Sequence, residues 1–301
     1  MPMPLSQARR PTLLIVGCGD IGLRVLRLVL PRWRVLALTS ARERLAELRT
    51  AGAVPLLGNL DAPATLGRLT QLARLADAVL HLAPPPAQGS GDPRTQALLR
   101  AVAHSGRVQR LVYASTTGVY GDCGGAWVGE TRTPNPGTER ARRRVAAEAR
   151  VRCFGRATGV RVGILRIPGI YAADRPGGHP RERLLRGTPV LCEVDDVHTN
   201  HIHADDLARA CVAALQRALP QRVVNVCDNS DLKMGDYFDL AADLCGLPRP
   251  PRLPRTEAAQ VLSPMLMSFM SESRRMHNQR LLGELRLRLR YPTVADGLQG
   301  T

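Results

Sequence analysis

The chain has 301 residues, of which 44% are apolar and 23% are charged, and this balance is typical of a globular protein and excludes wholesale disorder. No apolar run reaches the roughly 18 residues of a membrane span, and no small-residue cleavage site follows the short apolar stretch near the amino terminus. The net charge is +16 but aromatic residues are only 3%, so the charge indicates affinity for anions rather than a nucleic-acid surface. The seven cysteines follow neither metal nor disulfide spacing, which favours a cytoplasmic protein.

The first part of the chain alternates short apolar runs with segments whose apolar residues recur every three or four positions. The strands expected from this pattern are 12–16, 33–38, 54–57, 78–82 and 110–114, and the helices between them are 21–30, 41–50, 63–75 and 94–104. The alternation predicts an α/β fold, a Rossmann-type doubly wound parallel sheet with right-handed crossovers.

The second part of the chain is less regular. A loop rich in Gly, Thr and Pro is expected at 115–136, followed by a basic helix at 139–153, a strand at 160–167, a helix at 204–219 and a strand at 222–227. The chain is therefore expected to divide into a flexible leader at 1–10, a Rossmann domain at 11–170 plus 201–228, and a smaller C-terminal substrate lobe at 171–200 plus 229–301.

The turn after the first expected strand carries three glycines, Gly17, Gly19 and Gly22, at G-x-G-x-x-G spacing. One glycine permits the tight turn, one lets a pyrophosphate approach the backbone, and one packs the helix on the strand. Asp20 and Ile21 lie inside the motif, at the helix N-terminus that attracts phosphates. An ordinary strand–helix turn is the alternative, but the position after the first strand favours dinucleotide binding.

The end of the second strand distinguishes NADP from NAD. NAD-binding proteins place an acidic residue there for the ribose 2′-OH, whereas this chain has Thr39, Ser40 and then Arg42, with no acid before Glu43. Hydroxyls and a guanidinium can bind a 2′-phosphate, so NADP is favoured over NAD. The alternative is that Arg42 is a solvent-exposed helix residue paired with Glu43 or Glu47.

Seven phrases follow one another in an order typical of one protein family. They are VGCGDIG (16–22), GNLDAP (58–63), HLAPPP (81–86), LVYASTTGVYGD (111–122), GILRIPGIYA (163–172), HIHADDLARA (201–210) and VVNVCD (223–228). The chain resembles the NAD-dependent epimerase/dehydratase family, the extended short-chain dehydrogenases/reductases. It is most similar to atypical members that keep the cofactor site and lose part of the catalytic set.

The resemblance implies further residues of the cofactor site. By its phrases, the adenine contacts Asn59, Leu60 and Asp61, the nicotinamide ribose lies beside Leu82, Ala83 and Pro84, and the nicotinamide is flanked by Pro168 and Tyr171. Thr116, four residues before Tyr120, matches the Ser/Thr hydroxyl that hydrogen-bonds the reacting oxygen.

The family's Tyr-x-x-x-Lys pair, which carries the proton, has no counterpart, because none of the five tyrosines has a lysine four positions later. By resemblance, the two positions fall on Arg140 and Arg144. Arginine keeps its proton, so these residues are expected to bind an anionic part of the substrate or to stabilise an oxyanion. The remaining candidates for the proton donor lie in loops and are Tyr171, Asp122, Cys123 and Glu130, whereas Tyr120 is expected to be a packed ring.

Two further patterns have structural interpretations. His198, His201 and His203 have a spacing that metal ligands use, but by resemblance the last of them belongs to a packing phrase, so no metal is expected. Asp205 is expected to cap the helix that follows it. The Met-rich patch 265–270 is expected to be lobe core or a helix–helix contact rather than a cofactor contact.

These observations predict an NADP-binding, or alternatively NAD-binding, oxidoreductase in which Thr116 holds the oxygen of a carbonyl or carbinol substrate. A non-catalytic protein that binds or senses NADP is the main alternative. An epimerase or dehydratase is a third, and it would need a second acid–base group. The expected partner is a small molecule, anionic if it meets the arginines. By resemblance the chain could form a homodimer through helices on the sheet's outer face, and neither a nucleic acid nor a membrane is expected.

Overall fold

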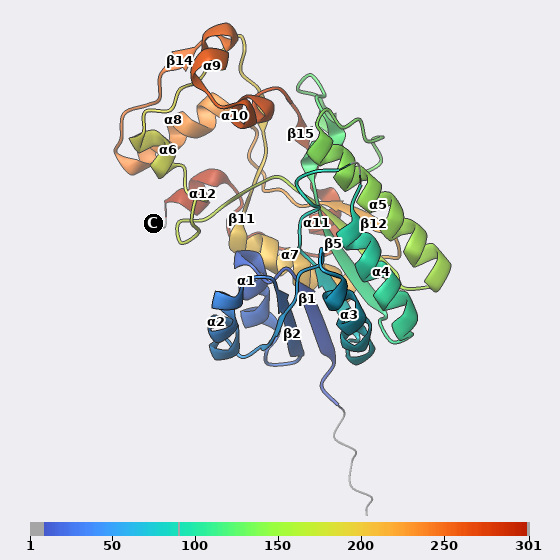
Figure 1. Cartoon of the computed structure of the whole chain (residues 1–301). Coiled ribbons are helices and arrows are strands. Elements are labelled where there is room, and N and C mark those ends of the chain that lie inside the picture. Colours follow the sequence, from blue (N-terminus) through green and yellow to red (C-terminus); the bar gives the residue numbers. More distant parts are fainter. Residues whose placement is uncertain (1–8, 90, 300–301) are drawn as a thin grey trace, which may run out of the picture.

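The computed structural model describes residues 9–89 and 91–299, so most of the leader expected at 1–10 lies outside the described residues. A parallel sheet forms the centre of the molecule (Figure 1). Its order is β12-β7-β5-β4-β1-β2-β3. The strands are β1 (Thr12–Val16), β2 (Arg34–Thr39), β3 (Val54–Leu57), β4 (Ala78–His81), β5 (Arg110–Thr116), β7 (Arg161–Ile167) and β12 (Arg222–Asn225). The order reverses between β1 and β4, and such a reversal opens a crevice at the carboxyl ends of the strands.

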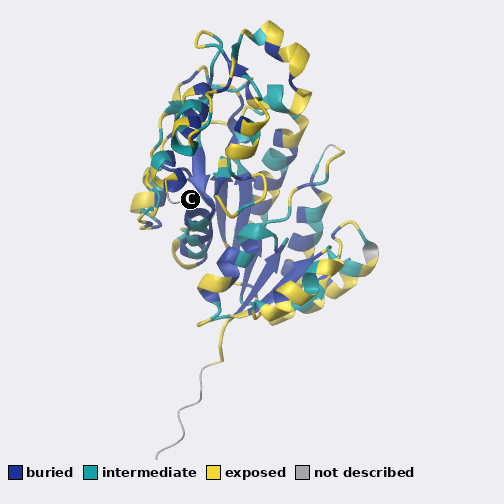
Figure 2. Ribbon diagram, turned by 90° about the vertical axis from the view of Figure 1, so that its left-hand side faces the viewer, coloured by how far each residue is buried: buried dark blue, intermediate teal, exposed yellow. Residues whose placement is uncertain are grey.

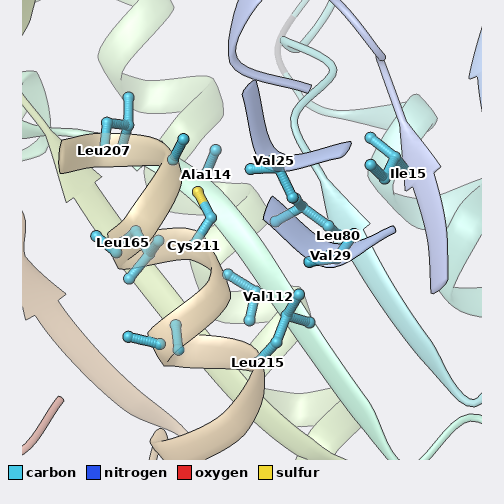
Figure 3. Close-up of a cluster of buried hydrophobic side chains, with 14 of the residues drawn as sticks. Ile15, Val25, Val29, Leu80, Val112, Ala114, Leu165, Leu207, Cys211 and Leu215 are labelled. Atoms are coloured by element: carbon cyan, nitrogen blue, oxygen red, sulfur yellow. The ribbon is translucent and has the colours of Figure 1, made fainter. Parts of the chain in front are cut away.

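The sheet is buried because helices cover both of its faces (Figure 2). One face packs on α1 (Asp20–Val29), α2 (Leu45–Thr50) and α7 (Ala204–Arg217), and Figure 3 shows the apolar side chains of α1 and α7 meeting those of the strands. The other face packs on α3 (Pro63–Leu75), α4 (Pro93–Ser105) and α5 (Glu139–Thr158). This three-layer arrangement confirms the predicted Rossmann-type fold. In the described part of the chain, no helix is long and apolar enough to cross a membrane.

The elements of the sheet start and end within one or two residues of their predicted positions, and three other segments differ. Helix α5 continues past Cys153 to Thr158, because Gly159 supplies the left-handed conformation that ends it. The segment expected to be one helix at 41–50 begins as a 3₁₀ turn, η1 (Arg42–Arg44), before α2. The loop at 115–136 contains η2 (Thr117–Tyr120) and a strand, β6 (Trp127–Val128), that pairs with β15 (Arg275–Met276) near the C-terminus.

Short elements make up the rest of the chain. They are β8 (Gly169–Tyr171), α6 (Arg181–Leu185), β9 (Val190–Leu191), β10 (His198–Thr199), β11 (His201–His203), β13 (Leu232–Lys233), α8 (Met234–Cys245), β14 (Arg252–Leu253), α9 (Arg255–Val261), α10 (Pro264–Phe269), α11 (Gln279–Gly283) and α12 (Val294–Leu298). Many of them share a small core around Tyr171, Val190 and Phe238. The core of the sheet also receives Leu281 and Leu285, which come from the span assigned to the lobe.

Candidate cofactor and substrate sites

The three glycines of the turn after β1 each meet a different steric demand. Gly17 has a φ of +86°, and a Cβ there would lie 2.6 Å from the backbone nitrogen of Ala83, so only glycine fits. A Cβ on Gly22 would lie 2.9 Å from a side chain of the turn itself. The nearest atom to a Cβ on Gly19 would be a nitrogen of Arg44 at 3.8 Å, which leaves this backbone open to a ligand. The turn therefore has the shape that a pyrophosphate needs.

The ends of β2 and β4 meet this turn. The backbone nitrogens of Gly17 and Cys18 donate to the carbonyl of Leu38, and those of Leu82 and Ala83 donate to the end of β1. The crevice at the strand reversal thus lies between the glycine turn and the segment that follows β4. Leu82 and Ala83 lie there, and their contact with the nicotinamide ribose stays a prediction.

Arginine meets the glycine turn, but from a position that the sequence did not indicate. Arg44 donates to the carbonyl of Cys18 at 2.7 Å and to Glu47 at 2.9 Å. Arg42 is exposed and forms no ion pair with the described residues, so the alternative pairing expected for it is not present in the structure. Arg44 is the last residue of η1, the 3₁₀ turn that stands where a regular helix was expected. Ser40 is exposed beside it.

The three residues predicted to contact the adenine, Asn59, Leu60 and Asp61, have different surroundings. Asp61 is ion-paired with Arg94 on α4, which holds the pKa of that carboxyl below its usual range. Arg94 also donates to the carbonyl of Pro84 at 3.0 Å and thereby links the two segments. Leu60 is buried in the core of the sheet, whereas Asn59 is exposed and accepts from the backbone of Asp61.

An ion-pair cluster joins the start of α1 to distant segments. Asp20 accepts from Arg24 at 3.1 Å and pairs with Arg175 at 3.2 Å. Arg24 also pairs with Asp174 and Asp205, each at 2.5 Å. The sequence predicted that Asp205 caps α7, and the structure shows that it does not. His203 does so, because its Nδ1 accepts from the backbone of Asp205.

A cavity of about 620 Å³ lies beside the crevice, between the end of the sheet and the short elements. Its lining includes five of the predicted cofactor and catalytic residues, namely Thr116, Arg140, Arg144, Pro168 and Tyr171. The fold thus brings together residues from the ends of β5 and β7, the start of α5, and β8. This position beside the carboxyl edge of a doubly wound sheet is where such folds bind substrates.

The side chains nearest the sheet have distinct surroundings. The Thr116 hydroxyl is partly exposed and accepts only a long hydrogen bond, 3.3 Å, from the backbone of Gly118. Arg144 donates to the carbonyl of Ala114 at 2.5 Å, so it is fixed at the end of β5. Arg140 is held by a ring contact, with its guanidinium 4.8 Å from the ring of Phe269. Arg140 is therefore the arginine of this pair that a ligand can reach.

Tyr171 does not fit the role of proton donor that the sequence suggests. Its side chain is 1% exposed, and its hydroxyl donates to the carbonyl of Thr293 at 3.2 Å. Burial raises the pKa of the phenol well above its usual range, which makes it a weaker acid. Tyr120 is fully buried and donates to Asn225 at 2.7 Å, which confirms that it is a packed ring.

The other loop candidates for the proton donor lie outside the cavity lining. Asp122 accepts from the backbone of Ser273 at 2.8 Å, and this and further backbone hydrogen bonds lower the pKa of its carboxyl. Cys123 donates weakly to nearby carbonyls. Glu130 is largely buried and accepts from the backbone of Asn225 at 3.0 Å. These side chains maintain loop structure.

The three histidines around β10 and β11 face different partners. His201 stacks on Tyr237 with ring centroids 4.1 Å apart, and burial lowers its pKa to about 3. His198 faces Asp231 at 3.3 Å, and His203 caps α7. Among the residues that the structure describes, no group of three or more His, Cys, Asp or Glu side chains is placed to hold a metal ion.

The cavity is strongly basic, and most of its charge comes from residues that no sequence motif marks. Only the excess of arginine along the chain indicated them. Its charged lining consists of Arg140, Arg144, Arg175, Arg183, Arg186 and Arg274 against Glu182 and Glu272. Glu272 is neutralised by Arg274 at 2.8 Å. The net positive potential favours an anionic ligand.

Several known proteins are similar to this chain in sequence or in fold. YeeZ from Escherichia coli (strain K12) is 28% identical over 244 residues, which cover 78% of this chain and 84% of that protein. A functionally unknown conserved protein from Silicibacter pomeroyi DSS superposes with a TM-score of 0.81 at 32% identity, over 96% of this chain and 97% of the other. UDP-glucose 4-epimerase from Thermotoga maritima, solved with UDP-glucose, superposes with a TM-score of 0.79 at 19% identity, over 96% of each chain.

A family model supports the same relationship over most of the chain. The model described as the NAD dependent epimerase/dehydratase family matches residues 13–227, from β1 to just beyond β12. This span contains the glycine turn, Thr116 and the start of α5. The chain belongs to the NAD-dependent epimerase/dehydratase family.

Proposed function

We propose that the chain is an NADP-dependent oxidoreductase that transfers a hydride between the nicotinamide and a carbonyl or carbinol carbon of an anionic substrate. The observation that carries the proposal is the glycine turn, in which Gly17 and Gly22 allow only glycine-sized contacts while Gly19 leaves its backbone open. A pyrophosphate binds such a turn because the N-terminus of α1 attracts negative charge. UDP-glucuronic acid 4-epimerase from Bacillus cereus, a structural neighbour with a TM-score of 0.76 at 19% identity, was solved in complex with NAD.

The preference for NADP rests on the positive charge at the end of β2. Arg44 lies against the turn, and the exposed Ser40 and Arg42 follow β2, so a 2′-phosphate would find a guanidinium there and no acid before Glu43. The predicted contact Thr39 is 7% exposed and its hydroxyl accepts from the backbone of Ala41 at 3.2 Å. The competing cofactor is NAD, whose ribose hydroxyl needs an acidic partner at this position. The nearby carboxylate of Glu47 is already paired with Arg44.

Within the cavity, we assign the reacting oxygen to Thr116, whose hydroxyl is partly exposed and weakly engaged. When bound, the nicotinamide supplies hydride chemistry, so the chain has to hold the oxygen and carry one proton. Arg274 links the neighbouring Thr117 hydroxyl, at 3.4 Å, to Glu272, at 2.8 Å. Carbinol oxidation releases a hydride from carbon to the nicotinamide and a proton from oxygen. We assign that proton directly to the Glu272 carboxylate, which lines the same cavity, because Arg274 donates to both of its partners and keeps its own protons.

The cofactor proposal is tested by fluorescence titration with NADPH and NADH. Arg44→Gln is expected to weaken NADPH binding about tenfold and NADH binding by less than about twofold, because only NADPH carries the 2′-phosphate. Arg49→Gln, an exposed arginine at the end of α2, is the matched control and is expected to change neither. Equal losses for both cofactors would contradict the NADP assignment, and no binding of either would contradict the proposed function.

A second candidate function is a protein that binds NADP without turnover. The burial of Tyr171 favours it, because the two tyrosines that line the cavity, Tyr171 and Tyr237, are only 1% and 7% exposed. The two candidates differ in one experiment, the oxidation of bound NADPH by a broad panel of carbonyl compounds. Turnover that Thr116→Ala abolishes supports the enzyme, whereas tight NADPH binding with no turnover supports the binding protein. The homodimer expected by resemblance remains a prediction that sedimentation can test.

A further inference from the structure

A second cavity lies at the edge of the sheet opposite the glycine turn. It has a volume of about 380 Å³ and lies where β1, β2 and β3 begin, towards the bottom of Figure 1. Its lining includes Arg10, Leu30, Trp33, Arg34 and Val54, and this cavity is named the edge hollow. The five residues of β1 separate it from the glycine turn by about 16 Å. A ligand of the edge hollow is therefore neither the dinucleotide nor a substrate that reacts with it.

The apolar part of the edge hollow contains an indole ring. Trp33 lies between the end of α1 and the start of β2, and together with Leu30 it packs against the core of the sheet while staying partly exposed. Within the described part of the chain, no other ring and no cation contacts this indole. Val54, at the start of β3, is 41% exposed and extends the apolar wall. An indole beside aliphatic side chains favours contact with another flat ring.

Two arginines give the edge hollow its charge. Arg10 and Arg34 are exposed, and neither side chain forms an ion pair or a hydrogen bond with the residues that the structure describes. A third arginine of the lining, Arg9, is paired with Asp77 at 2.9 Å. No acidic side chain of the described residues lines the hollow. Two guanidinium charges are thus uncompensated, and the fork of donors on a guanidinium matches the two oxygens of a carboxylate.

The size of the edge hollow limits its ligand. Pockets that bind small molecules span about 300 to 1,000 Å³ and combine apolar walls with a few polar groups. At about 380 Å³ the hollow lies at the lower end of this range, which suits a molecule of one or two rings. A nucleic acid fits less well, because a single indole cannot stack successive bases.

We propose that the edge hollow is a second ligand site, which binds a small aromatic carboxylate with its ring against Trp33 and its carboxylate between Arg10 and Arg34. The inference does not depend on the proposed function, because the lining of the hollow shares no residue with the glycine turn or with the basic cavity. The ring and the charge act together in this site. A neutral aromatic molecule and an aliphatic carboxylate of the same size are therefore both expected to bind more weakly.

The first test uses 4-nitrobenzoate as the probe, because nitroaromatic rings quench tryptophan fluorescence on contact. The chain has two tryptophans, so the full-length variant Trp127→Phe reports on Trp33 alone. We expect saturable quenching by 4-nitrobenzoate and at least about tenfold weaker binding of 4-nitrobenzamide, which keeps the ring but has no charge. Cyclohexanecarboxylate, which keeps the charge but has no aromatic ring, is expected not to displace the probe at equal concentration. Quenching that never saturates, or equal binding of the amide, would overturn the proposal.

The second test measures the affinity for 4-nitrobenzoate by calorimetry in chains that keep both tryptophans. Arg34→Gln is expected to weaken binding at least about fivefold, because it removes one of the two charges that face the carboxylate. Arg32→Gln is the matched control, since Arg32 is exposed two residues away and does not line the hollow. It is expected to change the affinity by less than about twofold. An equal loss in the control would assign the effect to the general charge of the surface, and undiminished binding in Arg34→Gln would also refute the site.

A third measurement separates the edge hollow from the basic cavity, which also attracts anions. Saturating NADPH is expected to leave the affinity for 4-nitrobenzoate unchanged, because the two ligands occupy opposite edges of the sheet. Competition between them would place the probe at the carboxyl edge and refute the inference. If NADPH itself does not bind, the proposed function is refuted, and the quenching of Trp33 together with the Arg34→Gln and Arg32→Gln titrations still decides whether the edge hollow is a site.

Discussion

Replacing Asp228 with asparagine tests how the protein tolerates a buried carboxylate. The Asp228 side chain is 4% exposed. One of its oxygens accepts from the backbone of Ser230 at 2.9 Å, while the other, Oδ2, is buried without a partner. Burial, together with the nearby carboxylates of Asp206 and Asp296, raises the pKa of this carboxyl from 3.8 to about 7. The folded protein therefore keeps a proton that the unfolded chain loses near pH 4.

The magnitude follows from this difference in pKa. The rise to about 7 makes the ionised carboxyl about 4 kcal/mol less favourable in the folded protein than in the unfolded chain. Between about pH 4 and about pH 7 the folded state binds one more proton than the unfolded state, so the free energy of unfolding falls as the pH rises. Asp228→Asn removes this titration. The variant is expected to exceed the wild type in stability by up to about 4 kcal/mol at about pH 8, and to lose that advantage near pH 4.

The assay is urea unfolding of wild type and Asp228→Asn at several values between about pH 5 and about pH 8. Asp243→Asn is the control, because Asp243 is exposed, pairs with Arg249 and stays ionised throughout this range. The control is expected to leave the pH dependence unchanged. If Asp228→Asn showed the same loss of stability with rising pH as the wild type, Asp228 would be ionised in the folded protein and the reasoning from its burial would be wrong.

Three further predictions concern the turn, the core and the proton. Gly17→Ala is expected to lower the free energy of unfolding in urea by about 1–3 kcal/mol and to weaken NADPH binding. The reason is that φ is positive at Gly17 and the backbone of the segment after β4 leaves no room for a Cβ. An unchanged stability and affinity would contradict this steric argument. Glu148→Gln is expected to cost about 3–5 kcal/mol, since it leaves the buried Arg166 unpaired, whereas Arg152→Gln, at the partly exposed side of the same carboxylate, is expected to cost far less. For any carbonyl compound reduced by the protein, Glu272→Gln is expected to lower kcat, with Glu272→Asp restoring part of it. An unchanged kcat in Glu272→Gln would remove Glu272 from the proton path.

Short-range patterns in the sequence were sufficient to predict the sheet and the glycine turn. The strands β1 to β5 are apolar runs bounded by residues that stop them, and the separation of the glycines dictates which of them contacts the neighbouring strand. Such features depend on a few adjacent residues. They are therefore readable from the chain without knowledge of tertiary contacts.

The substrate side was less predictable because its geometry depends on distant segments. Arg44 reaches the glycine turn from η1, a 3₁₀ turn that the sequence pattern did not distinguish from regular helix. The β6–β15 pair joins positions that no local pattern connects. Arg183 and Arg186, which line the cavity, lie in a stretch with no clear hydrophobic period, so no sequence pattern marks them. Arg140 and Arg144 could be placed at the cavity only through the family resemblance.

The ion pair between Asp20 and Arg175 has a thermodynamic consequence for occupancy. Arg175 lines the cavity, whereas Asp20 begins the helix behind the glycine turn, so a single contact belongs to both ligand sites. An anion in the cavity that drew Arg175 away would leave an extra negative charge beside the pyrophosphate position and lower the affinity for the dinucleotide. Linkage requires the converse with equal strength, so a bound dinucleotide would oppose that displacement and favour substrates that leave Arg175 where it is.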